Sequence, residues 1–276
     1  MKLTLGFSTC PNDTFIFDAM IHNKVDTEGL EFEVLMADVE ELNRNAFAGN
    51  IDITKLSYHS YLYVAKQYKL LNSGSALGYK NGPLVIAKDN INLEKSVSVK
   101  IAIPGKHTTA NLLLSVLYPN LSDKTEFLFS DIEDAVINKK VDAGLIIHEN
   151  RFTYEKKGLV KIADLGEEWE LQTKCPIPLG GIVIHRKHSA EIQQKVDRVL
   201  KRSVEFALAN PDSGKGFVKY YAQELEEEVI KMHIALYVNN FTVDLGETGK
   251  NAVFTLFERA TNLGVTANLP VDIFVD

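Results

Sequence analysis

Short hydrophobic segments along the chain are each followed by a polar loop and then by apolar residues at helical spacing. In the first unit, residues 3–7 alternate apolar and polar positions, residues 8–13 form a turn cluster, and an apolar run follows at residues 14–20. The same order predicts three further units, with strands at residues 51–56, 99–103 and 141–147. Strands that alternate with helices are typical of α/β proteins, in which ligands bind at the carboxyl ends of parallel strands.

Two matching segments start 98 residues apart, at residues 82–88 and 180–186. Each has a glycine, a short hydrophobic strand and then a basic residue. Two of the strand–loop–helix units lie between them, enough for one α/β domain inserted into another. We interpret the segments as strands that cross between two lobes, one of residues 1–85 plus 187–276 and one of residues 86–186. Two unrelated strands of one larger sheet are the alternative.

Composition and charge narrow the function classes. A chain of 276 residues with 45% hydrophobic and 24% charged side chains corresponds to a globular protein of about two domains. Its net charge of −7 provides no overall positive field for nucleic acid or anionic lipid. No apolar stretch approaches the roughly 18 to 20 residues of a membrane span, and the first residues lack a secretion signal. We expect a cytoplasmic protein that binds a small molecule.

The loops after the predicted strands are rich in small hydroxyl and amide side chains. In a two-lobed protein these loops open into the cleft between the lobes. Backbone N–H groups at a helix N-terminus favour anions, so a carboxylate or polyol ligand would match these loops. Ordinary helix capping is the alternative for any single loop. The residues concerned are Ser8, Thr9, Asn12, Asp13 and Thr14, then Thr54, Lys55 and Ser57, then Thr108 and Thr109.

His148 differs from the other histidines in its position. It follows the hydrophobic residues 144–147, so we expect it at the carboxyl end of a strand, facing the cleft. An imidazole with a pKa of about 6.5 accepts a proton near neutral pH. His148 is therefore a candidate general base, and a hydrogen-bonded structural histidine is the alternative.

The cysteines, a glycine-containing loop and the tryptophan give weaker indications of function. The two cysteines, Cys10 and Cys175, are too few for a disulfide scaffold or a thiolate metal site. Cys10 precedes a predicted helix, which can lower a thiol pKa, but the sequence assigns it no partner histidine and favours a packing role. Residues 104–109 lack the second glycine of a phosphate loop. Trp169 either covers an aromatic ligand or fills a core.

Four segments in register resemble one enzyme family. They are STCPNDTFIF at residues 8–17, TKLS at 54–57, HTTA at 107–110 and GLIIHE at 144–149. Together they resemble the 1,4-dihydroxy-6-naphthoate synthase family of menaquinone biosynthesis by the futalosine route. The resemblance spans the chain, with these segments in the expected order and at the expected separations, and the opening segment is the most specific.

The resemblance implies a two-lobed periplasmic-binding-protein-like fold (type II) and no metal or organic cofactor. It implies a carbon–carbon lyase that converts cyclic dehypoxanthine futalosine to 1,4-dihydroxy-6-naphthoate and dihydroxyacetone. His148 matches the family's proton acceptor, and we expect hydroxyl and backbone donors at Ser57 and Thr109 to hold the substrate. The positions that match substrate-binding residues are Lys55, Leu56, Ser57, Thr109 and Ala110. A cytoplasmic carboxylate- or polyol-binding protein and the related chorismate dehydratase are the alternatives.

Overall fold

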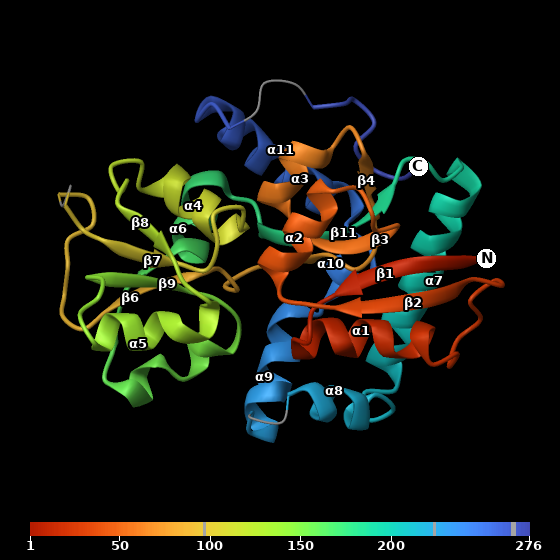
Figure 1. The fold of residues 1–276 in the computed structure, drawn as a ribbon, viewed down its shortest axis with the longest axis horizontal. Helices are drawn as coiled ribbons and strands as arrows, with labels where there is room; N and C mark the ends of the chain where they lie inside the picture. The colour runs from red at the N-terminus through yellow and green to blue at the C-terminus, as the bar shows by residue number, and fades with distance from the viewer. Residues whose placement is uncertain (96–97, 223–224, 266–268) are drawn as a thin grey trace.

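Two mixed β-sheets, each with its own helices, make up the two halves of the molecule (Figure 1). The computed structural model describes residues 1–95, 98–222, 225–265 and 269–276. One sheet has the strand order β2-β1-β3-β11-β4, with β5 paired to β11, and the other has the order β10-β6-β9-β7-β8. The predicted α/β class with two lobes is confirmed.

The first sheet combines a parallel and an antiparallel part. β1 pairs in parallel with β2 and β3, whereas β11 pairs antiparallel with β3, β4 and β5. Consecutive strands are joined by helices on the parallel side, as a parallel pair requires a crossover connection. The strands are β1 (Lys2–Phe7), β2 (Glu31–Met36), β3 (Ile53–Ser57), β4 (Tyr68–Leu70), β5 (Ala76–Gly78) and β11 (Ile177–His185).

The second sheet has five strands against six in the first, and it also combines parallel and antiparallel pairs. β7 pairs in parallel with β8 and β9, whereas β6 pairs antiparallel with β9 and β10. Its strands are β6 (Leu84–Ala87), β7 (Ile101–Ile103), β8 (Lys124–Glu126), β9 (Ala143–Ile146) and β10 (Val160–Asp164).

Helices cover both sheets and begin at recognisable caps. Pro11 opens α1 at its first position, where a missing N–H costs nothing, and the Thr108 hydroxyl caps α4 by accepting from the backbone N–H of Asn111. The helices of the first half are α1 (Pro11–Ile21), α2 (Val39–Phe47), α3 (Tyr58–Val64), α7 (Ala190–Ala209), α8 (Lys215–Tyr221), α9 (Glu227–Tyr237), α10 (Asn240–Val243) and α11 (Gly246–Asn262). Those of the second half are α4 (Thr109–Leu117), α5 (Ile132–Ile137) and α6 (Leu165–Thr173), with short 3₁₀ turns η1 (Phe129–Asp131), η2 (His148–Phe152) and η3 (Tyr154–Lys157).

The hydrophobic core is continuous between the two halves. One buried cluster includes Leu56 and Tyr58 from the first half together with Val85, Ile103 and Leu113 from the second. A separate cluster, which includes the stacked rings of Phe7 and Phe17, packs α1 and α7 on the first sheet. Because burial of apolar surface drives packing, the shared cluster holds the two sheets in one arrangement.

The chain crosses between the sheets twice. It first crosses through residues 79–83, which lie between β5 and β6, and it returns through α6 and the turn that precedes β11. The lobe boundaries at 85/86 and 186/187 stay a prediction, but one detail behind them is wrong. β11 pairs with β3 from Gly180 to Ile184, so residues 180–186 belong to the first sheet and do not cross between the lobes. The glycines allow this pairing, since a Cβ at Gly180 would lie 2.9 Å from the Leu56 carbonyl oxygen.

Within the described ranges, no helix has both the length and the apolar composition needed to cross a bilayer.

Candidate functional site

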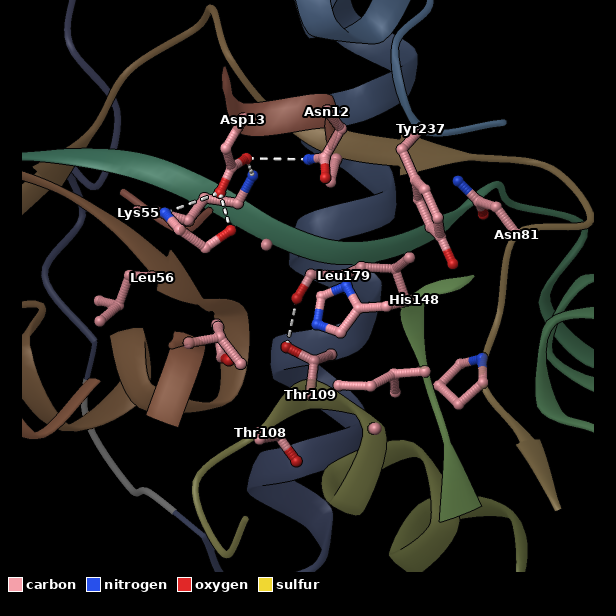
Figure 2. Close-up of a pocket in the computed structure, with 18 residues that line it drawn as sticks. Asn12, Asp13, Lys55, Leu56, Asn81, Thr108, Thr109, His148, Leu179 and Tyr237 are labelled. Carbon is pink, nitrogen blue, oxygen red and sulfur yellow. Dashed lines mark hydrogen bonds and ion pairs between the residues drawn. The ribbon is translucent and has the colours of Figure 1, made fainter. Parts of the chain in front are cut away.

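A cavity of about 690 Å³, part of it open to solvent, lies where the strand-to-helix loops of the two sheets meet (Figure 2). All six residues predicted for the site line it, so the structure brings them together, although their roles stay a prediction. The central cavity is lined by Ser8, Asn12, Asp13, Val39, Lys55, Leu56, Ser57, Ala76, Asn81, Pro83, Thr108, Thr109, Ala110, Ile147, His148, Leu179, Gly180 and Tyr237.

Asp13 is the centre of a buried hydrogen-bond network in the opening loop. Its Oδ1 accepts from Lys55 Nζ at 2.7 Å and from Asn12 Nδ2 at 2.8 Å. Its Oδ2 accepts from the Ser8 hydroxyl at 2.7 Å and from the Ser8 backbone N–H at 3.2 Å. Asp13 is 1% exposed and Lys55 is 7% exposed, so the two charges compensate each other inside the protein. The positive charge that Lys55 presents to a ligand is therefore already paired with the negative charge of Asp13.

This network also determines the protonation of His233. Because Asn12 turns its amide nitrogen toward Asp13, its Oδ1 faces His233 Nε2 at 2.9 Å and accepts a hydrogen bond from the Nε2–H group. Burial lowers the pKa of His233 well below its usual value, and the nearby His148 and Lys55 lower it further. His233 is thus neutral, and its ring stacks on His148 with centroids 6.1 Å apart. The neutral His233 therefore adds no charge to the cavity wall behind His148.

His148 stands just beyond the carboxyl end of β9, as predicted. Its φ of +58° lies in the left-handed region, which is costly for a side chain with a Cβ and is common at functional sites. Its Nδ1 lies 3.6 Å from the thiol sulfur of Cys10. The His148 ring therefore contacts Cys10 through Nδ1 and also lines the cavity.

Ser57 and Thr109 supply hydrogen-bond donors at the N-termini of α3 and α4. Ser57 Oγ accepts from Asn43 Nδ2 at 3.2 Å, which leaves the Ser57 hydroxyl proton to donate. The Thr109 hydroxyl instead donates to the Leu179 carbonyl (Figure 2). The backbone N–H groups of Thr109 and Ala110, which begin α4, have no intrahelical partner and are further donors at this position. That Thr109 holds substrate stays a prediction.

Several cavity residues escaped the sequence analysis. Asn81 stands between a lysine and Gly-Pro, which indicates a turn and no ligand, and Tyr237 is the last residue of an amphipathic helix. The question of Trp169 is settled, because it is fully buried and its indole N–H donates to the Pro176 carbonyl at 3.1 Å. It fills the core. Among the described residues, no three His, Cys, Asp or Glu side chains gather as metal ligands.

Comparison with known proteins identifies relatives over nearly the whole chain. Residues 3–262 match the family model described as "Menaquinone biosynthesis". The chain is 44% identical over 273 residues to the 1,4-dihydroxy-6-naphthoate synthase of Thermus thermophilus, covering 99% of both chains. It is 38% identical over 276 residues to the enzyme of the same name from Streptomyces coelicolor, covering 98% of this chain and 96% of the relative.

Solved structures confirm the predicted fold. A crystal structure of a protein from Archaeoglobus fulgidus matches with a TM-score of 0.90 at 38% identity, covering 96% of this chain and 98% of the other. The alkanesulfonate-binding protein of Xanthomonas axonopodis matches with a TM-score of 0.69 at 15% identity, covering 99% and 96%. The second likeness shows only the fold, that of periplasmic binding proteins. The sequence relatives and the family model show more: the chain belongs to the menaquinone-biosynthesis family that includes the 1,4-dihydroxy-6-naphthoate synthases.

Proposed function

We propose that this protein is a carbon–carbon lyase that converts cyclic dehypoxanthine futalosine to 1,4-dihydroxy-6-naphthoate and dihydroxyacetone. His148 would act as the general base. One observation carries the proposal: an imidazole with Nδ1 held against the Cys10 thiol lines a cavity shared with the donors of two helix N-termini. The names of the two curated relatives agree with the product.

The reaction needs a base and a place for developing negative charge. A base that removes a proton from the sugar-derived part of the substrate allows ring opening and carbon–carbon cleavage, and aromatisation of the second ring drives the reaction. His148 Nε2 is suited to take this proton. A positioned base of this kind contributes roughly 10²- to 10⁴-fold in rate.

Donors on the opposite wall are suited to hold the oxygen that gains charge. The Ser57 hydroxyl and the backbone N–H groups of Thr109 and Ala110 point to this role, because each has a proton with no acceptor inside its own helix or strand. A single well-aimed donor of this kind lowers a transition-state barrier by about 2.7–4 kcal/mol. The paired Asp13 and Lys55 would orient the substrate without adding net charge.

The test is turnover of the purified protein with cyclic dehypoxanthine futalosine, followed by the absorbance of the naphthoate product. In His148→Asn, asparagine tolerates the left-handed backbone at this position, so a loss of roughly 10²- to 10⁴-fold in kcat would report the missing base. The matched control is His22→Asn, because His22 is a half-exposed histidine at the end of α1, remote from the lining residues.

Three results would contradict the proposal. Turnover by His148→Asn at the wild-type rate would show that His148 is not the general base. Thermal stabilisation by the substrate without any product would favour a binding protein. Dehydration of chorismate by the wild type, without conversion of the futalosine compound, would favour the related dehydratase.

A further inference from the structure

Asn81 lines the central cavity with an amide that has no hydrogen-bond partner among the residues that the structure describes. The residue is 0% exposed, and within the described part of the chain neither its Oδ1 nor its Nδ2 has a hydrogen-bond partner. Figure 2 shows the Asn81 amide on the side of the cavity where Tyr237 and His148 lie. Buried polar groups are normally satisfied, so an exception at a binding cavity points to a ligand.

The backbone around Asn81 is held independently of its side chain. The Arg151 guanidinium donates to the carbonyls of Lys80 and Gly82, the residues on either side, and also pairs with Asp164 at 3.3 Å. These contacts hold the backbone on both sides of Asn81 without using its amide. A binding group whose surroundings are ordered in advance loses little freedom when the ligand arrives.

A neighbouring glycine makes the space for this amide. A Cβ at Gly78 would lie 2.9 Å from Asn81 Nδ2, closer than side chains approach each other. The other amide nearby, Asn239 Nδ2, is engaged with the Leu77 carbonyl at 3.0 Å. Packing thus admits the Asn81 amide while its two polar atoms have no hydrogen-bond partner among the described residues.

The chemistry of an amide narrows the ligand group. Asn81 offers one acceptor and a donor side by side, which adjacent hydroxyls satisfy together because each hydroxyl both donates and accepts. A carboxylate or a ketone only accepts, so it would leave Oδ1 without a partner. We propose that Asn81 binds the hydroxyl-bearing, sugar-derived part of the substrate and so determines specificity for it. This inference rests on the proposed function, which places that part beside His148.

The test compares the effect of Asn81 on the sugar-derived part of the substrate with its effect on the naphthoate part. Asn81→Leu should lower kcat/KM for cyclic dehypoxanthine futalosine by about 10- to 100-fold, because the substrate hydroxyls lose both partners. Binding of 1,4-dihydroxy-6-naphthoate, which lacks the sugar-derived part, should be unchanged in calorimetry. The melting temperature of ligand-free Asn81→Leu should be no lower than that of the wild type, since no protein hydrogen bond is lost. Asn81→Ala serves as a second variant with less bulk.

The matched control is Asn72→Leu. Asn72 Nδ2 donates to Asp197 Oδ2 and to the Val275 carbonyl outside the cavity, so this variant should melt earlier and keep its kcat/KM. An equal loss of product and substrate affinity in the Asn81 variants, or an unchanged kcat/KM, would overturn the assignment. So would a drop in melting temperature equal to that of Asn72→Leu, which would mark Asn81 as a structural amide.

Wild-type behaviour distinguishes a failure of this inference from a failure of the proposed function. If the wild type binds the futalosine compound without converting it, the lyase proposal fails, and the ratio of its Kd values for wild type and Asn81→Leu still decides the role of Asn81. If the wild type does not bind the compound, both proposals fail.

Discussion

The thiol sulfur of Cys10 lies 3.6 Å from Nδ1 of His148, although the two residues are 138 positions apart. The contact joins the loop before α1 in the first half to the end of β9 in the second. For His148 to accept a proton at Nε2, its Nδ1 must carry the other proton and donate it to the sulfur. The contact therefore gives Cys10, which has no partner in the sequence pattern, a means to orient the ring.

Replacement of Cys10 tests this orientation. We expect Cys10→Ala to lower kcat about tenfold with little change in KM, because the ring loses its acceptor and samples the wrong tautomer. Cys10→Ser keeps an acceptor and should retain most of the activity. Steady-state kinetics with the substrate of the proposed function provide the measurement.

Cys175→Ala is the matched control, since Cys175 lies beside Thr255 and is absent from the cavity lining. Equal kcat values for wild type and Cys10→Ala would show that the thiol has no part in orienting His148.

The buried Lys55–Asp13 pair predicts a large effect on stability. Lys55→Met leaves Asp13 as an uncompensated buried charge, so we expect the free energy of unfolding to fall by about 3–5 kcal/mol. Urea denaturation measures it. In the control, Lys2→Met, the ion pair with Glu33 is more than 60% exposed on both sides, so its loss should leave the free energy of unfolding close to the wild-type value. Similar effects from the two variants would contradict this account.

His59 makes stability depend on pH. Burial lowers the pKa of His59 to about 4, the nearby His107 lowers it further, and the Thr108 carbonyl partly offsets this. Between about pH 6.5 and 4, His59 binds a proton in the unfolded chain but not in the folded protein. Stability contributed by this residue is therefore complete above about pH 6.5 and falls as the pH drops, by up to about 1.4 kcal/mol per pH unit.

Denaturation curves between pH 4.5 and 8 measure this slope. His59→Asn, whose amide nitrogen can still donate to the Thr108 carbonyl, should flatten the slope below pH 6.5. A slope identical to that of the wild type would mean that other groups account for the whole pH dependence.

Glu40 links the two halves at the rim of the cavity. Its Oε1 lies 3.2 Å from His107 Nδ1 of the second half, and its Oε2 accepts from Asn43, which in turn holds Ser57. We expect Glu40→Ala to raise KM about tenfold with a smaller effect on kcat, because both the link and the Ser57 support are lost. Glu41→Ala, an exposed carboxylate on the same helix, is the control, and an unchanged KM in Glu40→Ala would argue against the link.

The sequence by itself determined the α/β class, the strand-to-helix loops as the place of the site, and residues in those loops that line the cavity, among them Lys55, Ser57, Thr109 and His148. These features follow from local patterns, because alternation predicts a strand and the residues after it must lie at that strand's carboxyl end. The resemblance of four segments added the family, and with it Leu56 and Ala110 as further positions of the site.

Only the tertiary structure decided the partners of these residues. Local pattern places His148 and Cys10 in loops, but their contact, the neutral state of His233 and the open amide of Asn81 depend on packing between segments far apart in the chain. The same holds for residues 180–186, which read as a crossing strand and instead pair with β3. Strand pairing, burial and hydrogen bonding are long-range properties, so no pattern of neighbouring residues specifies them.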